Sequence, residues 1–371
     1  MMNLEQCLED MVAHQASDLF VTVGMPVSAK INGQLTPLTS MPLNEEDALD
    51  LVHQAMTDKQ QTSFAEDKEC NFAIARDGIG RFRCSAFWQR DQAGMVVRRI
   101  VTEIPQVGDL GLPSVLKDII MAKKGLVLFV GGTGTGKSTS LAALIGHRNE
   151  NSHGHILTIE DPIEFVHEHR NCVVTQREVG IDTLSFDDAL KSSLRQAPDV
   201  ILIGEIRSME TMEYAMSFAD TGHLCVATLH ANNANQAIER IMHLAPKELH
   251  SKLRFDLSQN IRAIVAQQLV PTVDGNGRVA AIEILLNSPL VADLIQRNEI
   301  GSLKEAMVKG KESGMQTFDM ALYELFKSGR ITEEQAMHNA DSPNDLRLMI
   351  KLDSNSGTNL GSLSGVSIDM D

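Results

Sequence analysis

The sequence predicts an α/β protein in which a small α+β domain precedes a larger domain built on a parallel sheet. Strand and turn patterns dominate residues 1–104, with two helical patterns among them. From residue 114 onward, short apolar runs alternate with segments of helical apolar spacing, as a parallel sheet with crossover helices requires. A glycine-rich segment joins the first of those runs to the helix that follows it.

The first domain, residues 1–104, is predicted from two helices and a set of strands. Apolar residues recur at helical spacing in its first stretch, and Asn44 caps the start of a second helix. Strand patterns over 18–23 and 27–31 are separated by a turn, and Asn32-Gly33 is a strong hairpin signal. Further strands are expected at 71–76, 81–88 and 95–100.

Alternation along the strand 81–88 places Arg81 and Arg83 on one face, about 7 Å apart. The side chains of the other face are expected in the core, and they are Phe82, Cys84, Ala86 and Trp88. Two interpretations of the arginines stay open on this pattern. One is a solvated sheet face, which the pattern alone favours, and the other is a pair that binds phosphate.

Residues 131–139 match the phosphate-binding pattern G-x-x-x-x-G-K-[ST]. Glycines let the backbone approach phosphates closely, so that N–H groups and the positive end of the next helix surround them. Lys137 is expected to reach the β- and γ-phosphates of ATP, and the Ser138 hydroxyl to bind Mg²⁺. The expected nucleotide-binding residues are Gly131, Gly132, Thr133, Gly134, Thr135, Gly136, Lys137, Ser138 and Thr139.

The flanking patterns favour a phosphate site over a glycine-rich turn that binds nothing. Residues 126–130 are all apolar, as a buried central strand requires. Leu141, Leu144 and Ile145 recur at helical spacing after the loop. Strand, loop and helix therefore follow one another in the order that the pattern requires.

Two other apolar strands end in acidic residues. Glu160 and Asp161 follow the strand 155–159, and Glu205 follows the strand 200–203. An apolar strand that ends in acid is typical of a Walker B segment, which lies beside the P-loop in ATPase sheets. Ordinary loop polarity or a salt bridge is the alternative, but the P-loop favours roles near Mg²⁺ and water.

Glu164 is a third acid in the loop that follows the first of these strands. Asp199 begins its strand, about 20 Å of extended chain from Glu205, so we do not expect it at the metal site. The residues alone place Glu164 and Glu205 near the metal without deciding which of them polarises the attacking water.

A histidine stands at each end of the segment 223–230. Their separation of seven is odd, so strict alternation points them to opposite faces. His230 lies at the carboxyl end of its strand, where parallel sheets bind ligands, and is therefore the candidate for sensing the nucleotide. His223 is expected to be an ordinary loop histidine whose ring nitrogens are hydrogen-bonded.

The composition describes a globular chain of 371 residues with 43% hydrophobic residues and a formal net charge of −16. The acidic balance and the 4% aromatic content argue against a nucleic-acid motor, so no nucleic-acid partner is expected. No signal peptide or membrane-spanning run is expected. The five scattered cysteines indicate reduced thiols in the cytosol, with neither a disulfide framework nor a zinc site.

The remaining segments complete the predicted organisation. Residues 105–113, with two prolines and two glycines, are interpreted as a linker. The second domain spans 114–352, with strands over 265–286 and a helical part from 289 onward. Residues 353–371 are rich in Ser, Gly and Asn and are expected to be a disordered tail.

The chain resembles the type II/IV secretion ATPases, and within them the PilT-like type IV pilus retraction motors. Four segments, in this order and spacing, carry the resemblance, which covers residues 1 to about 350. They are GGTGTGKST at 131–139, TIEDPIEF at 158–165, VILIGEIR at 200–207 and TGHLCVATLHANNA, the histidine box, at 221–234. The chain looks most like the PilU-type members in three places, which are the sequence of its P-loop, the segment 194–215 and the polar tail.

The resemblance implies a PAS-like domain followed by a RecA-like ATPase domain. It also implies a cytoplasmic homohexamer, peripheral at the inner membrane, that docks beneath a platform protein and hydrolyses ATP with Mg²⁺ to power pilus disassembly. The alternative is an accessory ring of low turnover that modulates a PilT-type motor. The zinc insert of extension relatives is absent, and the family's helical segment after the histidine box has only a loose counterpart at 261–268.

The resemblance also implies roles for individual residues. Glu164 would polarise the attacking water, and Glu205 would belong to the Mg²⁺ shell. The interpretation of Arg81 and Arg83 is reversed, because the family directs arginines of this strand and the next one toward the γ-phosphate. The match in the next strand is Arg98, since Arg99 points the other way.

Overall fold

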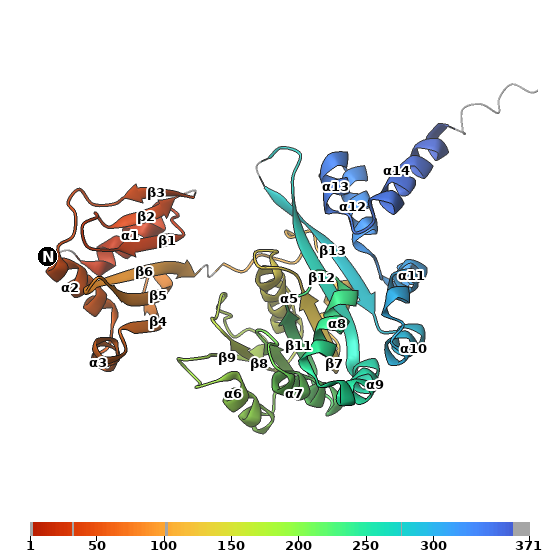
Figure 1. The fold of residues 1–371 in the computed structure, drawn as a ribbon, viewed down its shortest axis with the longest axis horizontal. Helices are drawn as coiled ribbons and strands as arrows, with labels where there is room; N and C mark the ends of the chain where they lie inside the picture. The colour runs from red at the N-terminus through yellow and green to blue at the C-terminus, as the bar shows by residue number, and fades with distance from the viewer. Residues whose placement is uncertain (1–2, 32, 101–102, 276, 359–371) are drawn as a thin grey trace, which may run out of the picture. The chain divides into compact units, whose positions relative to one another are not determined.

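The computed structural model describes residues 3–31, 33–100, 103–275 and 277–358. The chain divides into two compact units, coloured from red to blue along the chain in Figure 1. The first unit contains residues 1–104 together with the short segments 162–166 and 180–184. The second unit contains the rest of residues 105–371.

The first unit is an antiparallel sheet with three helices. Its strands lie in the order β3-β2-β1-β6-β5-β4, and every neighbouring pair is antiparallel. The strands are β1 (Asp18–Val21), β2 (Ser28–Ile31), β3 (Gln34–Pro37), β4 (Glu69–Arg76), β5 (Gly80–Gln89) and β6 (Gln92–Ile100). The helices are α1 (Leu4–Ala13), α2 (Glu45–Ala55) and α3 (Asp58–Asp67).

The sequence signals of this unit are mostly confirmed. The Asn44 side chain caps α2 by accepting from the backbone N–H of Asp47 at 2.8 Å. Asn32 of the expected hairpin turn lies outside the described residues, and β2 and β3 pair antiparallel on either side of it. Helix α3 was not predicted, because its sequence is polar and only Phe64 among its residues is buried.

The second unit is a seven-stranded sheet in the order β13-β12-β7-β11-β10-β8-β9. All neighbours are parallel except the pair β12 and β13, which is antiparallel. The strands are β7 (Gly125–Val130), β8 (Gly154–Glu160), β9 (Cys172–Glu178), β10 (Val200–Ile203), β11 (Leu224–Leu229), β12 (Ile261–Pro271) and β13 (Arg278–Leu286). Strand β9 was missed, because three of its last four residues are polar and half-buried at the sheet edge.

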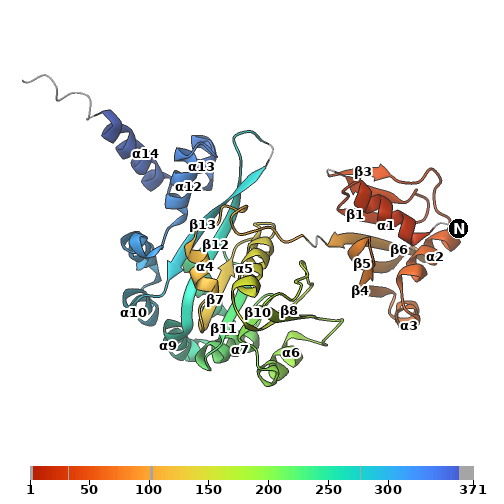
Figure 2. The ribbon, with the colours of Figure 1, turned by 180° about the vertical axis from the view of Figure 1, so that it is seen from behind.

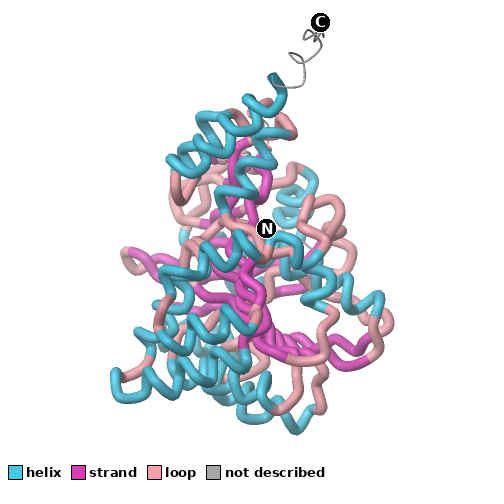
Figure 3. Tube along the Cα trace, turned by 90° about the vertical axis from the view of Figure 1, so that its right-hand side faces the viewer, coloured by secondary structure: helices cyan, strands magenta, loops and turns pink. Residues whose placement is uncertain are grey.

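Helices cover both faces of this sheet. Its strands alternate accordingly, since Leu128 and Val130 belong to the core shared with α7 and α8, whereas Val127 and Phe129 pack with α4 and α5. Figure 2 shows the face with α4 and α5, and Figure 3 distinguishes strands from helices. The helices are α4 (Val115–Ile120), α5 (Lys137–Asn151), α6 (Phe186–Ser193), α7 (Met209–Asp220), α8 (Ala234–Leu244) and α9 (His250–Asn260).

The C-terminal part of the unit is helical, as predicted. Its α-helices are α10 (Pro289–Arg297), α11 (Leu303–Lys309), α12 (Phe318–Lys327), α13 (Glu333–Asn339) and α14 (Pro343–Thr358). Short 3₁₀ segments lie at Leu194–Gln196, Lys247–Leu249, Ile300–Ser302 and Lys311–Ser313. Within the described residues, no helix is both long enough and apolar enough to span a bilayer. The arrangement of the two sheets and their helices confirms the predicted fold class.

Three sequence expectations differ from the structure. The loose counterpart at 261–268 of the family's helical segment is not helical but belongs to β12, so the strands expected over 265–286 begin earlier, at Ile261. Residues 105–113 are not a free linker, because Val107 and Leu112 are buried in the core of the second unit. The expected disordered tail begins too early at 353, since α14 continues to Thr358, and residues 359–371 lie outside the described residues.

Candidate active site

Four parallel neighbouring strands bring the sequence motifs to one edge of the sheet. Strands β7, β11, β10 and β8 lie side by side in register, with Val130 opposite Leu229 and Ile203 opposite Ile159. The P-loop follows β7, Glu160 ends β8, Glu205 follows β10 and His230 follows β11. Because the carboxyl ends of parallel strands meet at one edge, segments far apart in sequence become neighbours there.

The P-loop is folded around its own lysine. The Lys137 ammonium donates to the carbonyl oxygens of Gly131 at 2.7 Å and Gly132 at 2.8 Å. Gly134 (φ 77°) and Gly136 (φ 84°) adopt left-handed backbone, and α5 begins directly after Gly136. The loop N–H groups and the α5 N-terminus therefore form the surface that the motif predicts for phosphate.

Gln267 of β12 supports the P-loop and was not predicted as a site residue. Its side chain is 3% exposed, and its Nε2 donates to the carbonyl of Thr135 at 2.9 Å. A Cβ at Gly136 would lie 2.8 Å from that Nε2, and a Cβ at Gly131 would lie 2.6 Å from the Gln267 carbonyl. Glycine is thus required at both positions by packing as well as by φ. The one feature of the sequence that could have indicated this role is the position of Gln267, a polar residue directly after the apolar run 263–266.

Glu205 is held by two partners. Its Oε2 accepts from Arg207 at 2.8 Å (Nε) and 2.7 Å (Nη2), and its Oε1 lies 3.2 Å from Nε2 of His230. Arg207 also lies 3.7 Å from Asp161. The hydrogen bond to Glu205 is the main reason that the pKa of Arg207 is raised. Arg207 therefore joins the ends of β8 and β10, and Glu205 continues the contacts to His230 at the end of β11. The sequence analysis quoted Arg207 within a motif but assigned it no role.

The remaining acids that the sequence analysis considered are placed differently. Glu160 accepts from Thr158 at 2.6 Å and from Gln176 of β9 at 3.2 Å. Glu164 is exposed in the loop between β8 and β9, within the segment 162–166 that groups with the first unit. Its side chain forms no hydrogen bond or ion pair with another described residue. Asp199 accepts from the backbone N–H of His155 at 2.8 Å, at the amino ends of the strands, as expected for a residue outside the site.

The two histidines differ as expected. The His230 side chain is 49% exposed and contacts Glu205 at the carboxyl edge. His223 lies before β11, where its Nδ1 is 3.2 Å from the carbonyl of Phe218 and 3.1 Å from the hydroxyl of Thr221. His223 is therefore a hydrogen-bonded loop histidine, as the sequence predicted.

The three candidate arginines share one face of the first unit, which we call the arginine face (Arg81, Arg83, Arg98). Register places Arg83 opposite Arg98 on β5 and β6, and Arg81 lies two residues along β5. Arg98 forms an ion pair of 2.8 Å with Asp18 of β1. The Arg81 Nε is buried and has no hydrogen-bond partner among the described residues. Arg99 is opposite the core residue Phe82 and so points the other way, as predicted.

Asp18 has a lowered pKa. Burial alone would raise it, but hydrogen bonds from Arg98 and Ser17 and the charges of Arg98 and Lys30 outweigh burial. The carboxylate of Asp18 is thus fixed in its ionised form, and it holds one of the three arginines within its own unit.

A P-loop at the carboxyl edge of a RecA-like sheet, beside an acidic strand end and a histidine, defines a nucleoside triphosphate hydrolase. A family model described as "Type II/IV secretion system protein" matches residues 1–342. The chain therefore belongs to the type II/IV secretion family, and it is an ATPase. The resemblance that the four segments indicated is confirmed.

Individual relatives agree with this membership. The type IV pilus ATPase PilU of Pseudomonas aeruginosa is 59% identical over 371 residues, covering 100% of this chain and 97% of that protein. The type IV pilus retractation ATPase PilT of the same bacterium is 40% identical over 342 residues, 92% of this chain and 99% of that protein. A crystal structure of the pilus retraction motor PilT with bound ADP superposes with a TM-score of 0.88 at 38% identity, covering 94% of this chain and 100% of that one.

Proposed function

We propose that this chain is the subunit of a hexameric ATPase ring that drives or assists type IV pilus retraction. The observation that carries the proposal is the match of 59% identity to PilU over the whole chain, which includes both units. The intact P-loop, with Lys137 and Ser138, supports turnover of ATP rather than binding alone.

Within the site, we assign the P-loop to the ATP phosphates, and Lys137 to the β- and γ-phosphates. In this assignment the lysine exchanges two backbone carbonyls, Gly131 and Gly132, for phosphate oxygens. Each is an oxygen acceptor, so the ammonium keeps its hydrogen bonds when it moves. In the same assignment, residues 131–139 surround the triphosphate, and His230, which lies beside Glu205, senses the γ-phosphate.

The residues fit a magnesium ion that is held mainly by phosphates. The described residues contain no cluster of three or more His, Cys, Asp or Glu side chains that could form a metal cage. Ser138 lies in the first turn of α5, where its hydroxyl can serve as a protein ligand. Both oxygens of Glu205 are engaged by Arg207 and His230, so Glu205 fits a role through a bound water. Bound Mg²⁺ would neutralise charge on the β- and γ-phosphates.

Glu164 remains the proposed general base. Its exposed carboxylate has no competing ion pair among the described residues, whereas Glu205 is neutralised by Arg207. A carboxylate without a cationic partner is better suited to accept a proton from water. We propose that the arginine face binds the γ-phosphate when the first unit closes on a P-loop, so that closure switches hydrolysis on.

The partners and location follow from the family resemblance. We propose a ring at the cytoplasmic side of the inner membrane, docked on the pilus platform protein and cooperating with a PilT-type retraction ATPase. An accessory ring of low turnover is the second candidate, because the family resemblance implies that PilU-type members are typically accessory to a PilT-type motor. The identity is higher to PilU than to PilT, 59% against 40%.

Two measurements test these alternatives. The first is ATP hydrolysis by the purified protein with and without single-stranded DNA, with its mass measured by light scattering. We expect the protein to be a hexamer that hydrolyses ATP at the same rate with and without DNA. Stimulation of hydrolysis by DNA would contradict the proposal.

The second measurement is pilus retraction in cells that lack this chain, complemented with wild type or with Lys137→Ala. If the chain is a motor, the wild-type chain restores pilus retraction even in cells without the PilT-type ATPase, and Lys137→Ala does not. An accessory ring rescues only when the PilT-type ATPase is present. Pilus retraction at full strength without this chain, both in the presence and in the absence of the PilT-type ATPase, would refute both candidate functions.

A further inference from the structure

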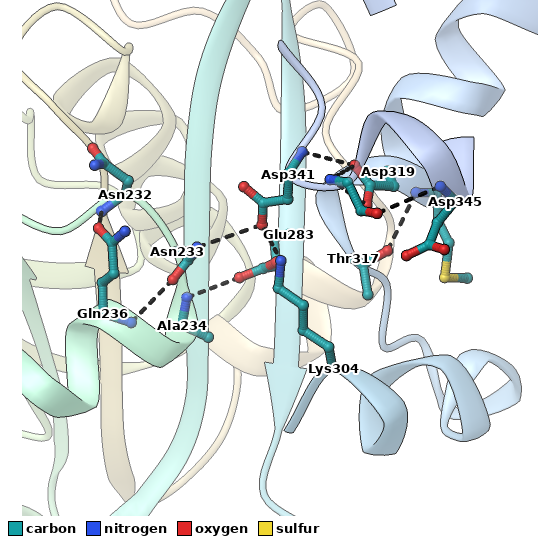
Figure 4. Close-up of polar contacts among 12 residues, drawn as sticks. Asn232, Asn233, Ala234, Gln236, Glu283, Lys304, Thr317, Asp319, Asp341 and Asp345 are labelled. Carbon is teal, nitrogen blue, oxygen red and sulfur yellow. Dashed lines mark hydrogen bonds and ion pairs between the residues drawn. The ribbon is translucent and has the colours of Figure 1, made fainter. Parts of the chain in front are cut away.

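A buried carboxylate lies beneath the helix that follows the histidine box. Glu283 of β13 is 0% exposed, and its Oε1 accepts from the backbone N–H of Ala234 at 2.8 Å. Ala234 is the first residue of α8, four residues after His230. Figure 4 shows the carboxylate directed at this helix N-terminus, with Asn233 beside it.

A second group of contacts continues from the same loop to the C-terminal helices. The Asn233 amide donates to Asp341 at 3.4 Å, and Lys304 of α11 binds the same Asp341 oxygen at 2.5 Å. Asp319, in the first turn of α12, accepts from the backbone of Asp341 at 2.8 Å. The residues that precede α8 are therefore linked by hydrogen bonds to α11, to α12 and to the segment between α13 and α14 (Figure 4).

The electrostatic surroundings of Glu283 are defined by its neighbours. Burial raises the pKa of Glu283 to about 7, and Asp341 adds to the increase. The backbone N–H of Ala234, the charge of Lys304 and the backbone N–H of Phe318 at the start of α12 oppose it. Strand β12 presents the neutral Ala266 opposite Glu283, whose Oε2 is buried without a hydrogen bond to a described residue.

We propose that Glu283 is a positioning residue for ATP hydrolysis. Its carboxylate fixes the N-terminus of α8 and thereby holds His230 against Glu205. Through Asn233, Asp341 and Lys304 the same cluster connects the nucleotide site to the C-terminal helices. We call Glu283, Asp341 and Lys304 the coupling cluster. This inference depends on the ATPase activity but not on the pilus assignment.

The ionised form of Glu283 is the one that holds the helix. Two helix N-termini, those of α8 and α12, direct backbone N–H groups toward this carboxylate, and a negative charge there is stabilised by both helix dipoles. Protonation removes the charge and weakens that hold. Turnover is therefore expected to rise with pH as Glu283 ionises around pH 7, the direction opposite to a site that requires a protonated acid.

The decisive variant is Glu283→Gln, which keeps an acceptor oxygen for Ala234 but cannot ionise. We expect kcat at about pH 8.5 to fall roughly 2- to 30-fold, the range for mutations that modulate coupling between sites. Affinity for ATP should stay within about twofold, because the P-loop is untouched. The ratio of wild-type to variant kcat should rise with pH through about 7.

Asp319→Asn is the matched control. Asp319 is also a buried carboxylate of this region, and its oxygens accept from Asp341 and Ser342, but it does not contact α8. It should lower the melting temperature and leave the pH dependence of kcat as in wild type. If Glu283→Gln behaves in the same way, with lower stability and an unchanged pH profile, Glu283 is a structural residue and the proposal is wrong.

A second variant decides the matter if Glu283→Gln does not fold. Lys304→Met removes the cation that lowers the pKa of Glu283 and leaves Asp341 without its ion-pair partner. Both effects favour protonated Glu283, so the rise of kcat should move to higher pH. A rise that stays in place would overturn the proposal as well.

Discussion

The P-loop and the arginine face hold their cations in different ways. Lys137 is held by two carbonyl oxygens of its own loop, five and six residues away in sequence. Arg98 is held by the side chain of Asp18, which is 80 residues away, and it meets Arg83 only through the register of β5 and β6. The first arrangement is visible in a short motif, whereas the second exists only after three strands have paired.

The largest expected effect is on the P-loop side of this comparison. Lys137→Ala should abolish measurable ATP hydrolysis, because it removes the positive charge from the β- and γ-phosphates. Lys123→Ala, at an exposed position before β7, is the control and should hydrolyse normally. Steady-state hydrolysis at the wild-type rate in Lys137→Ala would refute the site.

The acids come next. Glu164→Ala and Glu205→Ala should each bind ATP and turn it over at least about 100-fold more slowly, given typical general-base contributions. The exposed Glu210→Ala provides a matched control. Normal turnover in Glu164→Ala would remove its role, and a strongly altered Mg²⁺ dependence in that variant would show that Glu164 and Glu205 exchange roles.

The arginine face should show a smaller effect, and on turnover alone. Losing one charge-assisted hydrogen bond of about 1.5–3 kcal/mol corresponds to roughly 10- to 100-fold in kcat for each Arg→Ala variant. Nucleotide affinity should be nearly intact, because an arginine finger acts mainly in the transition state. Arg99→Ala is the control.

Light scattering shows whether each arginine variant still forms a hexamer. If Arg81→Ala, Arg83→Ala and Arg98→Ala all hydrolyse normally as hexamers, the arginines belong to a solvated sheet face, the interpretation that the pattern alone favoured.

A variant of Gln267 tests whether this side chain supports the P-loop. Gln267→Leu leaves the Thr135 carbonyl without its donor, at a cost of about 1 kcal/mol, so nucleotide affinity should fall roughly fivefold. The neighbouring Gln268, whose amide donates to Asn339 instead, provides Gln268→Leu as the control on the opposite face of β12. Equal affinities of the two variants by nucleotide titration would show that Gln267 does not support the loop.

The smallest effect concerns the stability of the arginine face. The folded pKa of Asp18 is lowered, so its ion pair stabilises the fold above the unfolded pKa near 4 and is lost as pH falls through the folded value. The Arg98 side chain is 72% exposed, so the contribution is at most about 1 kcal/mol. Asp18→Asn should lower the melting temperature by a few degrees at pH 7 and have no effect at strongly acidic pH. An equal loss at both pH values would contradict this.

The sequence predicted the features that short segments determine. The P-loop, the apolar strands β7, β10 and β11 and the cap at Asn44 each depend on residues close together in the chain. It missed β9 and α3, which are polar, and the buried polar residues Gln267 and Glu283. These two residues have partners from distant segments, so their roles follow from the tertiary fold, and a polar residue in an apolar run was the most that the sequence could signal.

The errors have the same origin. Residues 105–113 have the composition of a linker, but Val107 and Leu112 are buried against the second unit. The strand expected from residue 265 begins already at Ile261, because residues 261–264 pair with β7, a contact that no local pattern specifies. Glu205 and His230 were each expected near the nucleotide, but neither their contact nor Arg207 between the two acidic strand ends was assigned.

The hairpin of β12 and β13 tolerates insertions very unevenly along its length. Ala266 is opposite Glu283 and Gln267 is opposite Ile282, so the two buried polar residues occupy adjacent register positions and face opposite sides of the sheet. One extra residue between 263 and 267 would exchange those sides, moving Gln267 away from the P-loop and Glu283 away from α8 at once. Extra residues in the turn between the two strands leave the register unchanged. We therefore expect insertions to be tolerated in the turn between β12 and β13 and to be disruptive within the paired stretch.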